Sequence, residues 1–141
     1  MPLPTRYWQD LPWPAFRDLP ANTVAVLPVA SIEQHGPHLP VAVDTLIGNG
    51  VIAATLEALP ADLPVLVLPT QCVANSVEHL RFPGTLTTTP ETLLDLVTDI
   101  GASVARAGVK RLVICNSHGG NVAVLDIAAR RIRIQSSILV V

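Results

Sequence analysis

The sequence predicts an α/β fold in which a mainly parallel sheet has helices on both faces. Short apolar runs rich in β-branched residues alternate along the chain with longer segments whose apolar residues recur at helical spacing. This alternation is typical of parallel sheets, because each helical crossover returns the next strand in the same direction. No internal repeat or low-complexity tract interrupts the pattern.

The chain is predicted to be a single domain over residues 1–141 that opens with an irregular arm at residues 1–22. Prolines recur in this arm beside Trp8, Trp13 and Phe16, and prolines lack the amide hydrogen that a central strand needs. The predicted strands follow at residues 23–29, 65–68, 111–115 and 138–141. Each is a short apolar run, as expected for strands buried in a parallel sheet.

The first helix is predicted to begin at Asp44, a typical capping residue. The apolar positions at helical spacing are Ile47, Val51, Thr55 and Ala58. Gly48 and Gly50 weaken this prediction, because a glycine inside a helix costs about 0.8–1.0 kcal/mol relative to alanine.

The clearest helix is predicted over residues 90–107. Thr89 is a typical N-cap, Pro90 fits the first helical position, and Gly108 is placed to end the helix. Its apolar residues at helical spacing are Leu93, Val97, Ile100 and Val104. A third helix is predicted over 121–133, with the inward residues Leu125, Ala128, Ala129 and Ile132.

The composition excludes several classes of protein. Hydrophobic residues make up 50% of the chain and charged residues 14%, which is too apolar for a disordered chain and indicates burial between subunits of a homo-oligomer. The formal net charge is −2 and the basic residues are scattered, which argues against binding of nucleic acid or an anionic membrane. No apolar run approaches the ~20 residues of a membrane span and no signal-peptide pattern is present, so we expect a cytoplasmic protein.

Cys72 and Cys115 lack a Cys-x-x-Cys partner and are predicted to be small core residues.

Polar residues suited to catalysis follow three of the predicted strands. They are found at residues 33–35 (EQH), 75–79 (NSVEH) and 117–121 (SHGGN). The carboxyl ends of parallel strands meet at one edge of the sheet, which is where open α/β folds bind ligands. We therefore predict that the three segments form one site.

Four residues in and near these segments are predicted to bind metal: Glu33, His35, Asp44 and His118. Glu33 and His35 are two residues apart, so in extended backbone both side chains project from the same face. Asp44, at the start of a helix, can bring a second carboxylate to them. Oxygen and nitrogen donors without thiolates suit zinc or manganese in an open, water-bearing site.

Each fragment taken alone has a plainer interpretation. The residues of 33–35 could be solvated, Asp44 could be only a helix cap, and 117–121 could be a tight turn whose glycines adopt positive φ and whose Asn121 caps the next helix. The same turn could bind a phosphate at a helix N-terminus, as in a Rossmann-like nucleotide binder, but neither a Gly-x-Gly-x-x-Gly nor a Walker-type lysine motif is present. A non-catalytic metal-binding or assembly subunit is the other alternative. Convergence of the segments at the strand ends favours the metal site.

Three blocks, taken together and in order, resemble the creatininase family. The first is EQHGPHLP at 33–40 with Asp44 following, the second is SVEH at 76–79 leading into FPGT at 82–85, and the third is HGGN at 118–121. The similarity extends from Tyr7 to about Arg133. Each block alone is unspecific, whereas their joint occurrence is typical of this family.

The resemblance implies a three-layer α/β/α fold, a pair of divalent metal ions commonly filled by zinc, manganese or iron, and homo-oligomers, often hexamers. It implies that the four predicted metal-binding residues are ligands, with Asp44 in the bridging position. The implied reaction is hydrolysis of a C–N bond in a small amide by a metal-activated water. Within the pocket, Glu78 and His79 are predicted to be catalytic, and Ser76 and Asn121 to contact the substrate.

The sequence departs from the family pattern in two respects. Creatininase itself has a ligating glutamate two residues after the histidine that matches His118, whereas this sequence has Gly120 there. That difference argues against creatinine as the substrate. Family chains also continue with further strands and a His-Ala-Gly block, so we expect the 141-residue chain to be an N-terminal portion that is inactive by itself.

Overall fold

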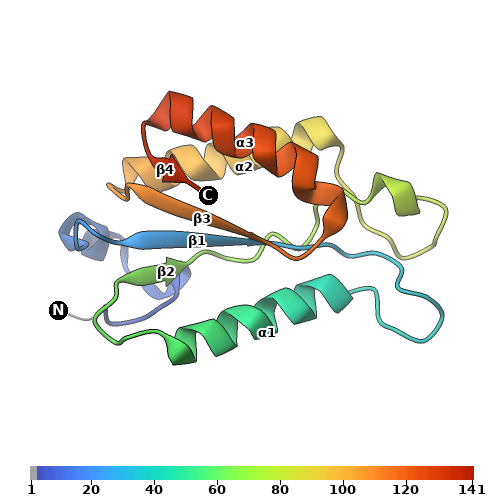
Figure 1. The fold of residues 1–141 in the computed structure, drawn as a ribbon, viewed down its shortest axis with the longest axis horizontal. Coiled ribbons are helices and arrows are strands. Elements are labelled where there is room, and N and C mark those ends of the chain that lie inside the picture. Colours follow the sequence, from blue (N-terminus) through green and yellow to red (C-terminus); the bar gives the residue numbers. More distant parts are fainter. Residues whose placement is uncertain (1–2) are drawn as a thin grey trace.

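The computed structural model describes residues 3–141 and confirms the predicted α/β fold (Figure 1). A four-stranded sheet has the order β2-β1-β3-β4, and every neighbouring pair is parallel. The strands are β1 (Val24–Val29), β2 (Val65–Val67), β3 (Arg111–Asn116) and β4 (Leu139–Val140). The two longest, β1 and β3, lie in the centre and pair in register from Val24–Arg111 to Val29–Asn116. The segments that follow them therefore leave the sheet side by side.

The helices form the two outer layers of a three-layer sandwich. Helix α1 (Val43–Ala58) covers one face of the sheet, and α2 (Pro90–Arg106) and α3 (Val122–Ser136) pack together on the other (Figure 1). Short 3-10 helices occur at Trp8–Asp10 (η1), Trp13–Asp18 (η2), Val77–His79 (η3) and Gly119–Asn121 (η4). Among residues 3–141, no helix is both long and apolar enough to cross a membrane.

The main core lies between the sheet and the α2–α3 layer. Its most deeply buried large side chains include Leu27, Leu93, Leu112 and Ile132, none more than 1% exposed. Helix α2 begins as predicted, because the Thr89 hydroxyl accepts a hydrogen bond from the Thr92 amide. It ends as predicted too, with Gly108 in the left-handed region at a φ of 87°.

Helix α1 differs from the prediction in the face that it buries. The helix begins at Val43, and Asp44 makes no side-chain cap. Its buried residues are Asp44, Gly48 and Ile52, whereas Ile47 and Val51 are more than half exposed. The physical reason is close packing through a glycine: a β-carbon built at Gly48 would lie 2.7 Å from Oγ of Ser117.

The α1 side of the sheet is covered less completely than the other side. Cys72 and Cys115, which were predicted to be core residues, are only half-buried free thiols. Cys115 lines an apolar cavity of about 280 Å³ between α1 and the sheet, beside Val26 and Val113. A single helix lies over this face, which explains why the thiol of Cys115 is not fully enclosed.

The N-terminal arm is attached to the rest of the fold by backbone contacts and by Trp8, which packs against the main core and, within the arm, against Phe16. The ring centroids of Trp8 and Phe16 are 4.6 Å apart. Tyr7 forms a parallel bridge with Val67 of β2, and the Val67 amide donates to the carbonyl of Arg6. The first residues of the predicted arm, 1–2, lie outside the described residues.

Candidate metal centre

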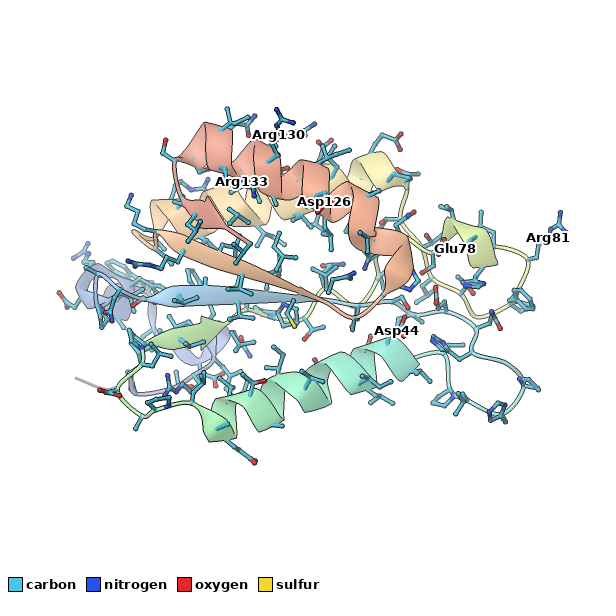
Figure 2. All side chains as sticks on the ribbon, viewed as in Figure 1. Asp44, Glu78, Arg81, Asp126, Arg130 and Arg133 are labelled. Atoms are coloured by element: carbon cyan, nitrogen blue, oxygen red, sulfur yellow. The ribbon has the colours of Figure 1, made fainter. Side chains whose placement is uncertain are left out.

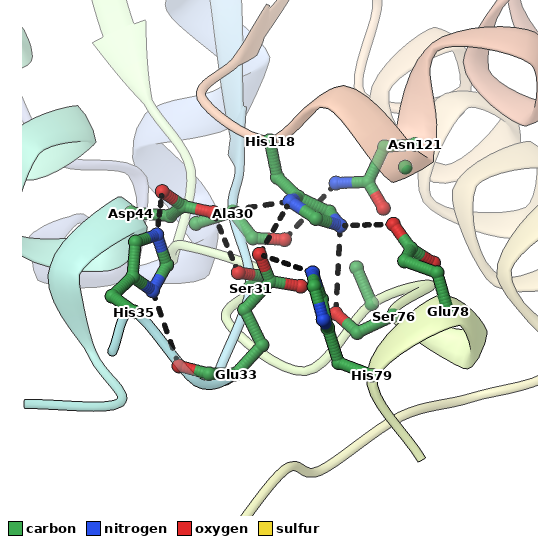
Figure 3. A network of polar contacts seen from close by, with 12 residues as sticks. Ala30, Ser31, Glu33, His35, Asp44, Ser76, Glu78, His79, His118 and Asn121 are labelled. Atoms are coloured by element: carbon green, nitrogen blue, oxygen red, sulfur yellow. Dashed lines mark hydrogen bonds and ion pairs between the residues drawn. The ribbon is translucent and has the colours of Figure 1, made fainter. Parts of the chain in front are cut away.

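The polar segments that follow β1, β2 and β3 meet at one end of the sheet, as predicted. Asp44, at the start of α1, and Glu78, on η3, lie at this same end of the molecule (Figure 2). A network of polar contacts joins them to the segments after β1 and β3 (Figure 3). The site therefore depends on four parts of the chain: the segment after β1, the start of α1, the segment after β2 and the turn after β3.

Asp44 is the residue that links most of these parts. Its Oδ1 lies 3.1 Å from Nε2 of His35, and its Oδ2 lies 3.0 Å from Nδ1 of His118. The Ser31 hydroxyl donates a hydrogen bond of 2.7 Å to Oδ2 and holds the carboxylate in place. A carboxylate that faces one imidazole with each oxygen is well placed to bridge two cations.

Glu33 is buried in the middle of the site, with only 4% of the residue exposed. Its Oε1 lies 3.3 Å from Nδ1 of His118 and 3.7 Å from Nε2 of His79. Its Oε2 is buried and has no hydrogen-bond partner. An unpaired buried carboxylate oxygen is costly, and a cation is the partner that would satisfy it.

In both predicted histidine ligands, one ring nitrogen faces a backbone carbonyl oxygen, to which it can only donate. Nε2 of His118 lies 2.9 Å from the carbonyl oxygen of Asn75, and Nδ1 of His35 lies 3.2 Å from that of Glu33. In each neutral ring, the nitrogen that donates to the carbonyl leaves a lone pair on the other nitrogen. Those lone pairs, on Nδ1 of His118 and Nε2 of His35, face Asp44, as is usual for metal-binding histidines.

Two overlapping groups of side chains have ligand atoms close enough for metal binding. Glu33, His35 and Asp44 form one group, and Glu33, Glu78 and His118 form the other, with ligand atoms within 4.8 Å of one another in each. All donors are carboxylate oxygens or imidazole nitrogens, a set that suits zinc and manganese. The structure thus brings the four predicted ligands together and adds Glu78 to them.

The two predicted catalytic residues lie at the rim of the site. The Glu78 side chain is 43% exposed, and its Oε1 lies 3.6 Å from Nε2 of His118. The amide nitrogen of Gln34 lies 3.1 Å from Nδ1 of His79 and is placed to donate to it. With Nδ1 as acceptor, His79 carries its proton on Nε2, which faces Glu33.

Ser76 and Asn121, which were predicted to contact the substrate, are both fully buried. The Asn121 side chain accepts from the Asn75 amide and donates to the Ala30 carbonyl, and so ties together the segments after β1, β2 and β3. Ser76 lies behind His118, with its Oγ 3.5 Å from Nε2. Both side chains support the site from within the protein.

The plainer interpretations of the individual motifs do not describe the structure. Asn121 makes no side-chain cap on α3, and among the described residues the glycines with positive φ are Gly36, Gly84 and Gly108, none of them in 117–121. Ser31, which orients Asp44, was not among the residues predicted for the site, and Asn75, whose carbonyl orients His118, was predicted only as part of the polar segment 75–79. Ser31 could have been found, because it precedes Glu33 by two residues and an extended backbone places both on one side.

Comparison with known proteins identifies relatives of this chain. A family model described as "Creatininase: Creatinine amidohydrolase" matches residues 9–141. A mycofactocin precursor peptide peptidase of Mycobacterium tuberculosis is 41% identical over 114 residues, which is 77% of this chain and 45% of the relative. The creatinine amidohydrolase of Pseudomonas putida is 34% identical over 131 residues, which is 88% of this chain and 50% of that protein. The chain therefore spans about half the length of the curated relatives it matches.

Solved structures show the same relationship. A crystal structure of creatinine amidohydrolase superimposes with a TM-score of 0.75 at 30% identity, covering 99% of this chain and 58% of that one. A manganese form of creatininase superimposes with a TM-score of 0.76 at 30% identity, covering 97% of this chain and 58% of that one. Since the family model covers nearly all of the sequence and the relatives share its fold, this chain belongs to the creatininase family.

Proposed function

We propose that this chain forms the metal-binding part of a hydrolase that cleaves a C–N bond in a small amide or at the end of a short peptide. The observation that carries the proposal is the buried Oε2 of Glu33, which has no partner in the protein. The other oxygen of this carboxylate, Oε1, lies 3.3 Å from Nδ1 of His118, and the imidazoles of His118 and His35 each direct a nitrogen at one oxygen of Asp44. A bound cation would neutralise these carboxylates and be coordinated by the imidazole lone pairs.

Glu33, His35, Asp44 and His118 are the residues that would hold the cations, with Asp44 between them. A bound zinc or manganese ion would lower the pKa of a water toward ~7 and polarise the amide carbonyl. The chain contributes the orientation of the ligands: Ser31 fixes Asp44, and the carbonyl of Asn75 fixes the ring of His118. Supporting contacts of this kind orient the side chains that bind a metal.

His79 is the proposed proton donor to the departing nitrogen. Its ring is half-buried at the rim, and Gln34 holds it with the proton on Nε2, directed into the site. Removal of a positioned proton donor typically lowers a rate by about 10²–10⁴-fold.

The relatives hydrolyse different kinds of C–N bond according to their names, a peptide in one case and the cyclic amide creatinine in the other. Gly120 removes one side chain from the site at a position where creatininase has a carboxylate. We therefore place the substrate in the wider class of amides and peptide ends, with creatinine disfavoured.

We also propose that the protein forms homo-oligomers. Leu46, Ile47 and Val51 are more than half exposed along the outer face of α1. Contiguous apolar residues on the surface of a globular protein often mark an interface.

The proposal is tested by measuring bound metal and turnover together. The protein that contains this chain is purified, its zinc, manganese and iron are quantified, and hydrolysis of cyclic amides, formamides and short peptides is measured with added manganese or zinc. We expect bound metal and turnover of at least one amide class. Metal without turnover would favour an assembly subunit, and nucleotide binding without metal would favour the Rossmann-like alternative.

A further inference from the structure

The backbone at Gly120 leaves no room for a side chain. A β-carbon built there would lie 2.7 Å from the carbonyl oxygen of Asn75 and 2.5 Å from Nε2 of His118. The first of these neighbours is backbone, which cannot rotate away as a side chain does. The carbonyl of Asn75 is also needed where it is, because it accepts the proton of His118 Nε2.

The space beside Gly120 is filled by the carboxylate of Glu78. The same β-carbon would collide with Oε1 of Glu78. Glu78 reaches this position from η3, and its Oε1 lies next to the imidazole of His118 (Figure 3). A carboxylate is therefore present at this point of the site, although position 120 does not supply it.

His118 cannot by itself provide the ligands on this side of the site. Its Nε2 is engaged by Asn75, and its single free lone pair, on Nδ1, faces Asp44 and Glu33. The other carboxylate in this group is that of Glu33, whose Oε2 has no partner. Two carboxylates would form an oxygen-rich site, which favours manganese over a softer ion.

We propose that Glu78 is a metal ligand that binds the second cation together with Glu33, and that it takes the place of a carboxylate at position 120. The inference rests on the proposed function of the site as a metal centre. The Glu78 side chain is 43% exposed and so has the freedom to adjust its oxygens to an ion. Its role is then to complete the metal pair rather than to transfer protons.

The test is a titration with Mn²⁺, in which free ion is measured by electron paramagnetic resonance. The full chain is compared with Glu78→Gln and with Glu57→Gln, a matched control at an exposed position on α1. We expect the parent and Glu57→Gln to bind two ions per chain and Glu78→Gln to bind one. Glu78→Asp, which keeps the charge, should retain the second ion with weaker affinity. Circular dichroism establishes that each variant is folded.

Two ions bound to Glu78→Gln with the affinity of the control would overturn the inference while leaving the proposed metal centre intact. A single ion bound to the parent would also overturn it, because no second site would then exist in this chain. If the parent binds no ion at all, the proposed function itself fails. A loss of one ion in Glu78→Gln alone supports the assignment without reference to activity.

Discussion

Nδ1 of His118 lies 3.0 Å from Oδ2 of Asp44, and this contact joins the turn after β3 to the first turn of α1. The neighbouring residue strengthens the same junction, because the Ser117 hydroxyl donates to the backbone carbonyl of Asp44 at 2.9 Å. The position of the carboxylate is therefore fixed through both its side chain and its backbone. Substitutions at this junction should affect metal binding and stability differently, and the two effects can be measured separately as metal content and as the free energy of unfolding.

Replacement of His118 by alanine should remove most of the bound metal. The imidazole supplies one ligand nitrogen, and loss of a supporting residue alone typically weakens metal binding by about 10–100-fold, so loss of a ligand should weaken it at least as much. The measurement is metal content after dialysis against a weak chelator. His38→Ala, at an exposed position in the loop after β1, is the control and should keep its metal. Equal metal content in both variants would contradict the assignment of His118.

Asp44→Asn should remove bound metal but lower the free energy of unfolding only slightly. An acidic residue in the first turn of a helix contributes about 0.3–1 kcal/mol through the helix dipole. Glu91→Gln provides a matched control, because Glu91 is an exposed acid in the first turn of α2. We expect both variants to lose a similar small stability without metal, and Asp44→Asn alone to lose metal. If the two variants differ only in thermal unfolding, Asp44 is structural.

Replacement by alanine should have opposite effects on stability at two glycines of α1, Gly48 and Gly50. Gly48→Ala places a β-carbon 2.7 Å from Ser117 Oγ, and such overpacking typically costs about 1–3 kcal/mol. Gly50 has nothing within 4 Å of its would-be β-carbon, so Gly50→Ala should stabilise the protein by about 0.5–1 kcal/mol. Urea unfolding of the two variants and the parent gives both values. Stabilisation by Gly48→Ala would show that α1 does not pack closely on the turn after β3.

Asn121→Ala should destabilise the protein strongly. The side chain is fully buried, and its removal would leave the Asn75 amide and the Ala30 carbonyl without partners. Each unsatisfied buried group costs about 1–3 kcal/mol, so we expect a loss of at least about 2 kcal/mol in the free energy of unfolding. Asn22→Ala, at an exposed position before β1, should change it by less than about 0.5 kcal/mol. A loss of activity at unchanged stability would instead favour the earlier hypothesis that Asn121 contacts the substrate.

Much of the fold could be predicted because its signals are local. The Thr89 cap, the Pro90 start and the Gly108 end of α2 lie within or next to the helix that they delimit. The site could also be located, since three polar segments follow parallel strands and the carboxyl ends of such strands must meet. The buried face of α1 could not be predicted from its apolar spacing, because the contact of Gly48 with Ser117 involves a residue far along the chain.

The sequence by itself therefore determined the order of strands and helices, the edge of the sheet that holds the site and the residue types gathered there. Only the tertiary structure decided which of those side chains are buried, which contact one another and which face the open part of the site. Asn121 lies fully buried and links three segments by hydrogen bonds, and Glu78 lies in the space beside Gly120. The physical reason is that hydrogen-bond partners, free lone pairs and close approaches depend on distances between remote segments, which periodicity along one segment does not encode.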